Sequence, residues 1–155
     1  MAREYRRQEA PSPEVPLESF RVNPVFRASG WWHDCGVPET VLLVDDHAGF
    51  RAAARQLLET SGFEVVGEAM DAQTAVAAMI RLRPQVVLVD IQLPDLDGID
   101  LAEVLFITCP DAIVVLISSR PAADYGPRLR ESRAAGFISK SELSRGTLTA
   151  LLHHS

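Results

Sequence analysis

The amino-acid sequence predicts an α/β domain, a doubly wound five-stranded parallel sheet with five helices. From Glu39 onward, short apolar runs of strand length alternate with segments whose apolar residues recur at helical spacing. The predicted strands are apolar along nearly their whole length, which is typical of parallel strands that are buried on both faces. Helices that alternate with such strands cover the two faces of one sheet, and this produces the doubly wound arrangement.

The first half of this domain is predicted to contain two strands and two helices. In order, they are a strand at Thr40–Val44, a helix at Ala48–Thr60, a strand at 64–66 and a helix at Ala72–Leu82. The first helix has one apolar stripe and is followed by Gly62, a residue type that favours helix termination. Asp71 is a suitable N-cap for the second helix, and Pro84 closes that segment.

The second half is predicted to contain three strands and three helices. In order, they are a strand at 85–89, a helix at Gly98–Thr108, a strand at 112–117, a helix at 122–134, a strand at Gly136–Ser139 and a helix at 142–153. The helix at 122–134 has the weakest pattern, because Gly126 and Pro127 interrupt it and Pro121 precedes it. A proline removes a backbone donor and can break a helical turn, so we expect this helix to be short, irregular or mobile.

Composition limits the classes of function. The 155 residues include 15 basic and 21 acidic side chains and are 47% hydrophobic. This is enough apolar material for the core of one domain, and the net charge of -6 argues against a protein that binds nucleic-acid phosphates. No apolar run reaches the roughly 18 residues that a membrane span needs. Two cysteines, Cys35 and Cys109, do not make a disulfide framework, so we expect a cytoplasmic protein.

Residues 1–38 read differently from the rest. They hold five of the chain's ten prolines and show no apolar periodicity. No apolar segment follows the early arginines, so the segment is not a secretory signal. We therefore expect a disordered N-terminal extension at 1–38 and a folded domain at 39–155. The alternative is a docking arm that presents Trp31 and Trp32 to a partner.

Charged and polar residues follow the predicted strands where their carboxyl ends meet. They are Asp45 and Asp46, then Asp90, Ser118 and Lys140, the chain's one lysine. In doubly wound sheets the binding crevice lies at this edge. Three converging carboxylates repel one another unless a cation or a proton intervenes, and Mg²⁺ suits three aspartates completed by water. A carboxylate beside Mg²⁺ is also a reasonable phosphoryl acceptor.

Four segments carry a family resemblance. They are VLLVDDH at 41–47, VLVDIQLPDLDG at 87–98, ISS at 117–119 and GFISK at 136–140. In this order they resemble the first strand, the phosphoacceptor strand with its loop, the switch hydroxyl and the last strand of response-regulator receiver domains of two-component signalling. The resemblance extends over residues 39–155, is most similar to receivers of the NarL/LuxR type, and implies the flavodoxin-like receiver fold.

The resemblance implies a phosphoacceptor and a metal site. Asp90 would accept a phosphoryl group from a partner histidine kinase and form an acyl phosphate. Asp46 would ligate Mg²⁺ directly, Asp45 mostly through water, and the backbone carbonyl of Gln92 would supply a further ligand beside Asp90.

The resemblance also implies a switch, with some departures from the family. Ser118 and Lys140 would bind phosphoryl oxygens, and Phe137 would turn inward when Ser118 moves towards the phosphoryl group. Phe137 replaces the commoner tyrosine of the family, so this would be a switch by packing only. Ser141 stands where the family usually has proline, which leaves the geometry of that loop open.

The remaining polar residues near these motifs have simpler interpretations. Asp95 and Asp97 are interpreted as turn residues before Gly98, without a chemical role. His47 is interpreted as a helix-start residue rather than a metal ligand, because no second histidine or cysteine has matching spacing. Arg120 and Gln92 flank the predicted site and are expected to tune hydrolysis of the acyl phosphate.

The leading hypothesis is a cytoplasmic signalling receiver that is not an enzyme beyond its own phosphorylation and dephosphorylation. Its partners would be a histidine kinase or phosphotransfer protein and a downstream protein, with a homodimer possible and with no nucleic acid or membrane bound. No DNA-binding module follows the last helix, so the chain would be a stand-alone receiver or a truncated regulator. One alternative is an interaction module that keeps the fold without phosphorylation. The other is a Mg²⁺-dependent phosphatase with an aspartate nucleophile, although the adjacent Asp45 and Asp46 do not form that class's D-x-D motif.

Overall fold

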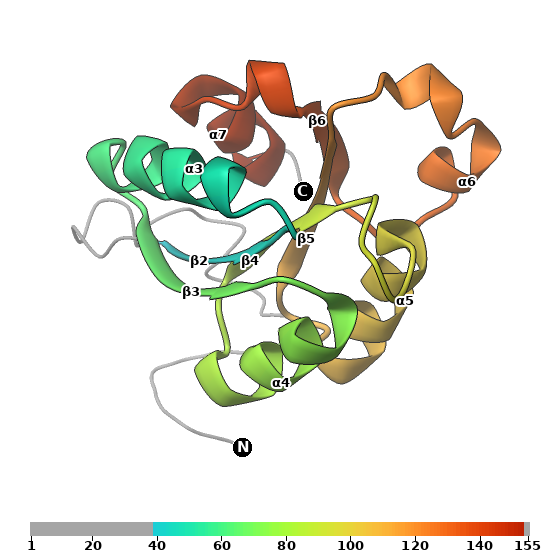
Figure 1. The fold of residues 1–155 in the computed structure, drawn as a ribbon, viewed down its shortest axis with the longest axis horizontal. Helices are drawn as coiled ribbons and strands as arrows, with labels where there is room; N and C mark the ends of the chain where they lie inside the picture. The colour runs from blue at the N-terminus through green and yellow to red at the C-terminus, as the bar shows by residue number, and fades with distance from the viewer. Residues whose placement is uncertain (1–38, 154–155) are drawn as a thin grey trace. The chain divides into compact units, whose positions relative to one another are not determined.

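A five-stranded parallel sheet lies at the centre of the computed structural model, which describes residues 39–153 (Figure 1). The strands are β2 (Thr40–Val44), β3 (Glu64–Ala69), β4 (Val86–Asp90), β5 (Ile113–Ser118) and β6 (Gly136–Ser139). Their order across the sheet is β3-β2-β4-β5-β6, and each neighbouring pair is parallel. The chain therefore adds β3 on one side of β2 and all later strands on the other, which confirms the predicted doubly wound fold.

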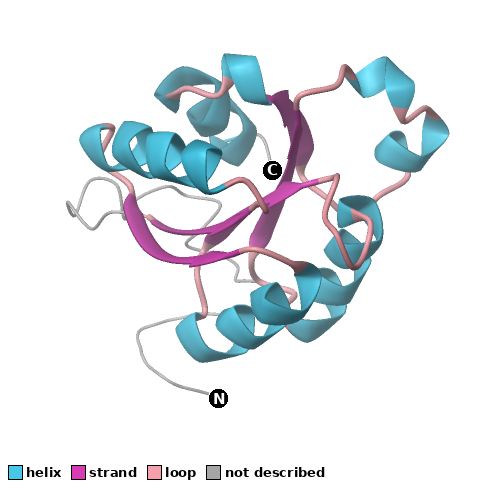
Figure 2. Cartoon of the chain, viewed as in Figure 1, coloured by secondary structure: helices cyan, strands magenta, loops and turns pink. Residues whose placement is uncertain are grey.

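Helices cover both faces of the sheet (Figures 1 and 2). In chain order the helical elements are α3 (Ala48–Thr60), α4 (Ala72–Leu82), α5 (Gly98–Thr108), the 3₁₀ turn η1 (Ala122–Asp124), α6 (Pro127–Arg130), the 3₁₀ turn η2 (Lys140–Glu142) and α7 (Arg145–His153). Figure 1 shows α3 and α7 on one side of the sheet and α4 and α5 on the other. No helix among residues 39–153 is long and apolar enough to cross a membrane.

The strand residues divide between two apolar cores. Along β2, Val41 and Leu43 pack into one core with α3 and α7, whereas Leu42 and Val44 pack into the other with α4 and α5. This alternation follows from the two-residue repeat of a strand. Every residue of β4 is buried, as expected for a central strand of a sheet that is covered on both faces.

The fourth helix is short and irregular, as predicted, but it is not a continuous helix over 122–134. The segment instead forms η1 and the four-residue α6. Gly126 separates them with a φ of 60°, a left-handed conformation that glycine adopts without a steric penalty. Pro127 then occupies the start of α6, where its missing N–H is not needed by the helix.

Two predicted boundaries were wrong by three residues, and β4 and β5 each lie one residue later than predicted. The second strand was predicted at 64–66, but β3 continues to Ala69. All of β2 pairs with β3, and the register of this pairing shifts between Val41 and Leu42. The last helix begins at Arg145, not at residue 142. Lys140–Glu142 form η2, and Ser144 then caps α7 by accepting a hydrogen bond from the Thr147 backbone N–H at 3.1 Å. The predictions for residues 1–38 lie outside the described residues.

Candidate acidic site at the carboxyl edge of the sheet

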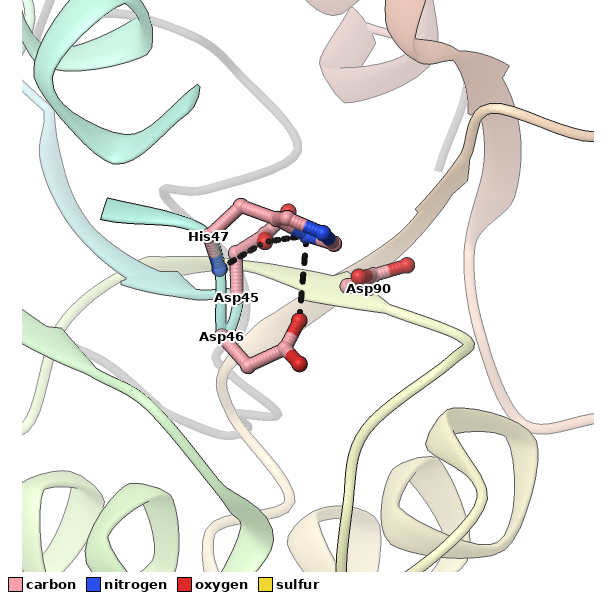
Figure 3. Close-up of side chains that lie close together, drawn as sticks. All are labelled: Asp45, Asp46, His47 and Asp90. Atoms are coloured by element: carbon pink, nitrogen blue, oxygen red, sulfur yellow. Dashed lines mark hydrogen bonds and ion pairs between the residues drawn. The ribbon is translucent and has the colours of Figure 1, made fainter. Parts of the chain in front are cut away.

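Three carboxylates meet at the carboxyl edge of the sheet. Asp45 and Asp46 directly follow β2, and Asp90 is the last residue of β4, the parallel neighbour of β2. Figure 3 shows the three side chains gathered at this edge, where one ligand atom from each lies within 4.8 Å of the others. Asp45 and Asp90 are only 1% and 2% exposed, whereas Asp46 is open to solvent. The predicted convergence of these aspartates is present in the structure.

Lys140 lies against the two buried carboxylates. Its Nζ is 2.6 Å from Asp45 Oδ2 and 3.3 Å from Asp90 Oδ2, and it stands 4.5 Å from the centre of the Phe50 ring. Burial disfavours the charged form of this lysine, but the two aspartates outweigh that effect and raise the pKa of Lys140. The ammonium is therefore charged and lies at the acidic cluster. Lys140 directly follows β6, the strand end at which the sequence analysis predicted it.

Asp90 has opposing influences on its ionisation. Burial raises the pKa of Asp90, and the negative charge of Asp45 adds to this effect. The Gln92 backbone N–H, which donates to Asp90 Oδ1 at 3.1 Å, and the nearby Lys140 ammonium act in the opposite direction. The net result is a raised pKa, which is common for carboxylates that take part in chemistry.

The charge balance of the cluster favours a divalent cation. Three carboxylates face one ammonium, which leaves two negative charges uncompensated when all three aspartates are ionised. Oxygen donors at this mutual distance are the ligands that Mg²⁺ prefers. Asp45, Asp46 and Asp90 therefore fit the predicted metal and are the side chains that would hold it.

His47 is closer to this site than its interpretation as a helix-start residue suggests. It is the N-cap of α3, as interpreted, but its Nδ1 also lies 3.3 Å from Asp45 Oδ1 and 3.1 Å from Asp46 Oδ1 (Figure 3). Its backbone N–H donates to the same Asp45 oxygen at 2.8 Å. The available signal was its position directly after the two aspartates.

Ser118 is the last residue of β5 and is fully buried. Its Oγ accepts a hydrogen bond from the Arg120 backbone N–H at 3.0 Å and shares a second hydrogen bond with Tyr125 Oη at 2.6 Å. The Tyr125 ring in turn stands beside Phe137 of β6, with 6.4 Å between the ring centres. Sequence reasoning placed Ser118 and Phe137 in the site but missed Tyr125, because its position depends on the irregular path of η1 and α6.

The acidic loop before α5 has a structural role. Asp97 is the N-cap of α5 and accepts the Ile99 N–H at 2.7 Å. Asp95 accepts the N–H groups of Ala72 and Gln73 at the start of α4, and these backbone hydrogen bonds lower the pKa of Asp95. Both aspartates therefore stabilise helix N-termini, a more specific role than the turn positions that we predicted.

The fold and this site together define a receiver-type α/β signalling domain. The chain belongs to the response regulator receiver domain family, whose family model matches residues 41–153. The resemblance carried by the four sequence segments is therefore confirmed. Members of this family are typically signalling modules rather than enzymes.

Transcription regulators are among the similar proteins. The chain is 36% identical to BvgA of Bordetella pertussis over 103 residues, which is 66% of this chain and 49% of BvgA. It is 29% identical to the DNA-binding transcriptional activator EvgA of Escherichia coli K12 over 110 residues, 71% of this chain and 54% of EvgA. The chain thus spans about half the length of the curated relatives that it matches.

Solved structures of receivers share this fold. A LuxR-family two-component response regulator from Aurantimonas sp. SI85-9A1 matches with a TM-score of 0.68 at 27% identity, covering 76% of this chain and 87% of that one. CheY of Borrelia burgdorferi, in a complex with CheX, beryllofluoride and magnesium, matches with a TM-score of 0.69 at 25% identity. That match covers 83% of this chain and 96% of the CheY chain.

Proposed function

We propose that this receiver accepts a phosphoryl group on Asp90 from a histidine kinase or phosphotransfer protein in a Mg²⁺-dependent reaction. The observation that carries this function is the position of Asp90, a buried carboxylate at a strand end beside the Lys140 ammonium and the carboxylates of Asp45 and Asp46. The binding of beryllofluoride and magnesium by the similar CheY supports the same chemistry for this chain.

The transfer replaces one bond to phosphorus with another. A carboxylate oxygen of Asp90 attacks the phosphorus of a phosphohistidine, the P–N bond breaks, and its electron pair returns to the imidazole nitrogen. Mg²⁺, when bound, offsets the negative charge of the carboxylates and of the phosphoryl oxygens. Lys140 then stabilises a phosphoryl oxygen with an ammonium that is already held at Asp90, 3.3 Å away.

Ser118 and Phe137 transmit the change to the surface. The Ser118 hydroxyl turns to donate to a phosphoryl oxygen, and Phe137 fills the space that it vacates. The altered surface then binds a downstream protein or a second copy of the chain, without nucleic acid or membrane. Receiver domains are generally cytoplasmic, and we place the reaction there.

Phos-tag electrophoresis after incubation with acetyl phosphate and Mg²⁺ tests this function. In this reaction the P–O bond of acetyl phosphate breaks and acetate leaves. We expect a shifted band for the wild type that is absent with EDTA and absent in Asp90→Asn. Asp100→Asn is a matched control, because this exposed aspartate of α5 lies outside the acidic cluster and its loss is expected to leave the shift unchanged.

Rapid hydrolysis of the acyl phosphate would conceal a true phosphoprotein in this assay. Beryllofluoride titration with Mg²⁺ is therefore run beside it, because this phosphoryl mimic is not hydrolysed. No shifted band and no beryllofluoride binding by a folded protein would contradict the proposed function. That result would favour an interaction module that works without phosphorylation.

A further inference from the structure

The Ser118 hydroxyl forms hydrogen bonds with two neighbouring groups. Its Oγ already accepts the Arg120 N–H, and Tyr125 Oη lies 2.6 Å away. A hydroxyl carries one hydrogen, which it donates to one acceptor at a time. A phosphoryl oxygen offers only acceptor sites, so binding it requires this hydrogen. Either hydroxyl can be the donor in the contact between Ser118 and Tyr125, but the proposed turn of Ser118 Oγ towards the phosphoryl group breaks this contact in both cases, so Tyr125 competes with a phosphoryl group for Ser118.

The Tyr125 ring also links this hydrogen bond to the aromatic residue of β6. Its ring centre is 6.4 Å from that of Phe137, with the ring planes inclined at 53°, which is the tilted arrangement that aromatic pairs favour. Both side chains are half-buried and pack against the apolar core beneath α4 and α5. A displacement of Tyr125 therefore changes the packing around Phe137.

We propose that Tyr125 is a second switch residue, which holds Ser118 in the unphosphorylated arrangement and releases it when Asp90 carries a phosphoryl group. Release frees the Tyr125 ring beside Phe137, and the two aromatic residues then rearrange together. Tyr125 directly precedes Gly126, the residue that separates η1 from α6, so its release also reaches these two elements. Because this role rests on the proposed phosphorylation of Asp90, the test measures both steps separately.

The test is a titration with beryllofluoride and Mg²⁺ of the wild type and of Tyr125→Phe. This substitution keeps the ring beside Phe137 and removes only the hydroxyl that bonds Ser118. Losing one competing hydrogen bond is expected to tighten beryllofluoride binding about two- to ten-fold. Tyr5→Phe, at the chain's other tyrosine, is the matched control and is expected to leave the affinity unchanged.

A double-mutant cycle with Ser118→Ala assigns the effect to the hydrogen bond. In the Ser118→Ala background, Tyr125→Phe is expected to change the affinity by less than about two-fold, since the partner is gone. An affinity for Tyr125→Phe that is equal to or weaker than that of the wild type would overturn the role of Tyr125. A wild type that binds no beryllofluoride would overturn the proposed function itself, and with it this role.

NMR provides a readout that does not depend on affinity. In a Tyr5→Phe background, tyrosine labelled with ¹³C at Cζ alone gives one signal, from Tyr125. We expect this signal to shift when beryllofluoride binds, because the phenol loses its partner. A Tyr125 signal that stays in place while beryllofluoride saturates the site would refute the switch.

Discussion

Gly98 is the first residue of α5, and its backbone lies against the end of β4, the strand that carries Asp90. Its N–H donates to the Ile91 carbonyl at 2.7 Å. A Cβ atom added at this position would stand 2.3 Å from the backbone oxygen of Asp90 and 2.6 Å from Ile91 Cα. Contacts this short are well inside van der Waals separation, so the substitution Gly98→Ala forces a backbone to move.

The size of the effect follows from the nature of these neighbours. Both are backbone atoms of β4 and of the residue after it, and no side-chain rotation relieves the clash. Overpacking of this kind costs about 1–3 kcal/mol. We therefore expect Gly98→Ala to lower the free energy of unfolding by about that amount and to reduce phosphorylation, because the displaced backbone carries Asp90.

Gly49 is the matched control. It lies in the first turn of α3, and a Cβ atom added there meets nothing within 4 Å. Since alanine loses less backbone entropy than glycine in a helix, Gly49→Ala is expected to raise the free energy of unfolding by about 0.5–1 kcal/mol. The same substitution thus has opposite signs at two helix starts of one domain.

Urea denaturation followed by far-UV circular dichroism measures both changes, with the midpoint and the slope fitted for each variant. The two midpoints should move in opposite directions relative to the wild type. A Gly98→Ala protein as stable as the wild type would refute the close approach of α5 to β4. A shift of both variants to higher stability would show that the helix propensity of alanine dominates at both positions.

The structure predicts the direction in which three further substitutions change the stability of the fold. Asp90→Asn in EDTA at neutral pH is expected to raise the melting temperature, because it removes a charge that burial disfavours; an unchanged or lower value would contradict that account. The Arg55 guanidinium lowers the pKa of Glu68, so this pair stabilises the fold above the ordinary carboxyl pKa of about 4.3 and loses its effect as the pH falls. Glu68→Gln should therefore make urea midpoints less dependent on pH below that value, and an unaltered slope would exclude the pair as a contributor. Asp71→Ala removes the N-cap of α4 and should lower the free energy of unfolding by about 0.5–2 kcal/mol in the same assay, whereas Asp71→Asn should retain most of the wild-type stability.

The acidic site could be predicted because it depends on the strands alone. Parallel strands end at a common edge, so the residues at or just after the ends of β2, β4 and β6 lie at that edge once the strands are known. Continuous apolar runs locate these strands without reference to distant contacts. The positions of Asp45, Asp90 and Lys140 follow from this rule and need no information on side-chain packing.

The residues that were missed depend on irregular backbone. Tyr125 reaches Ser118 only because the chain leaves β5, forms η1 and reverses at Gly126, a path that no periodic pattern encodes. His47 turns its ring back to two carboxylates through a local conformation at the start of α3. Neither contact can be read from hydrophobic spacing, which reports burial but not the direction of a polar side chain.

The position of Tyr125 offers a physical explanation for the phenylalanine at position 137 of the last strand, β6. The resemblance to receivers calls for a tyrosine at the position of Phe137, and a hydroxyl is absent there. In the structure, a tyrosine hydroxyl lies instead on the neighbouring Tyr125, bonded to Ser118. In the proposed switch, the polar and the packing parts would thus occupy two side chains on separate elements, η1–α6 and β6. A phosphoryl group at Asp90 would then reach the irregular segment directly through a hydrogen bond, as well as through the packing of Phe137.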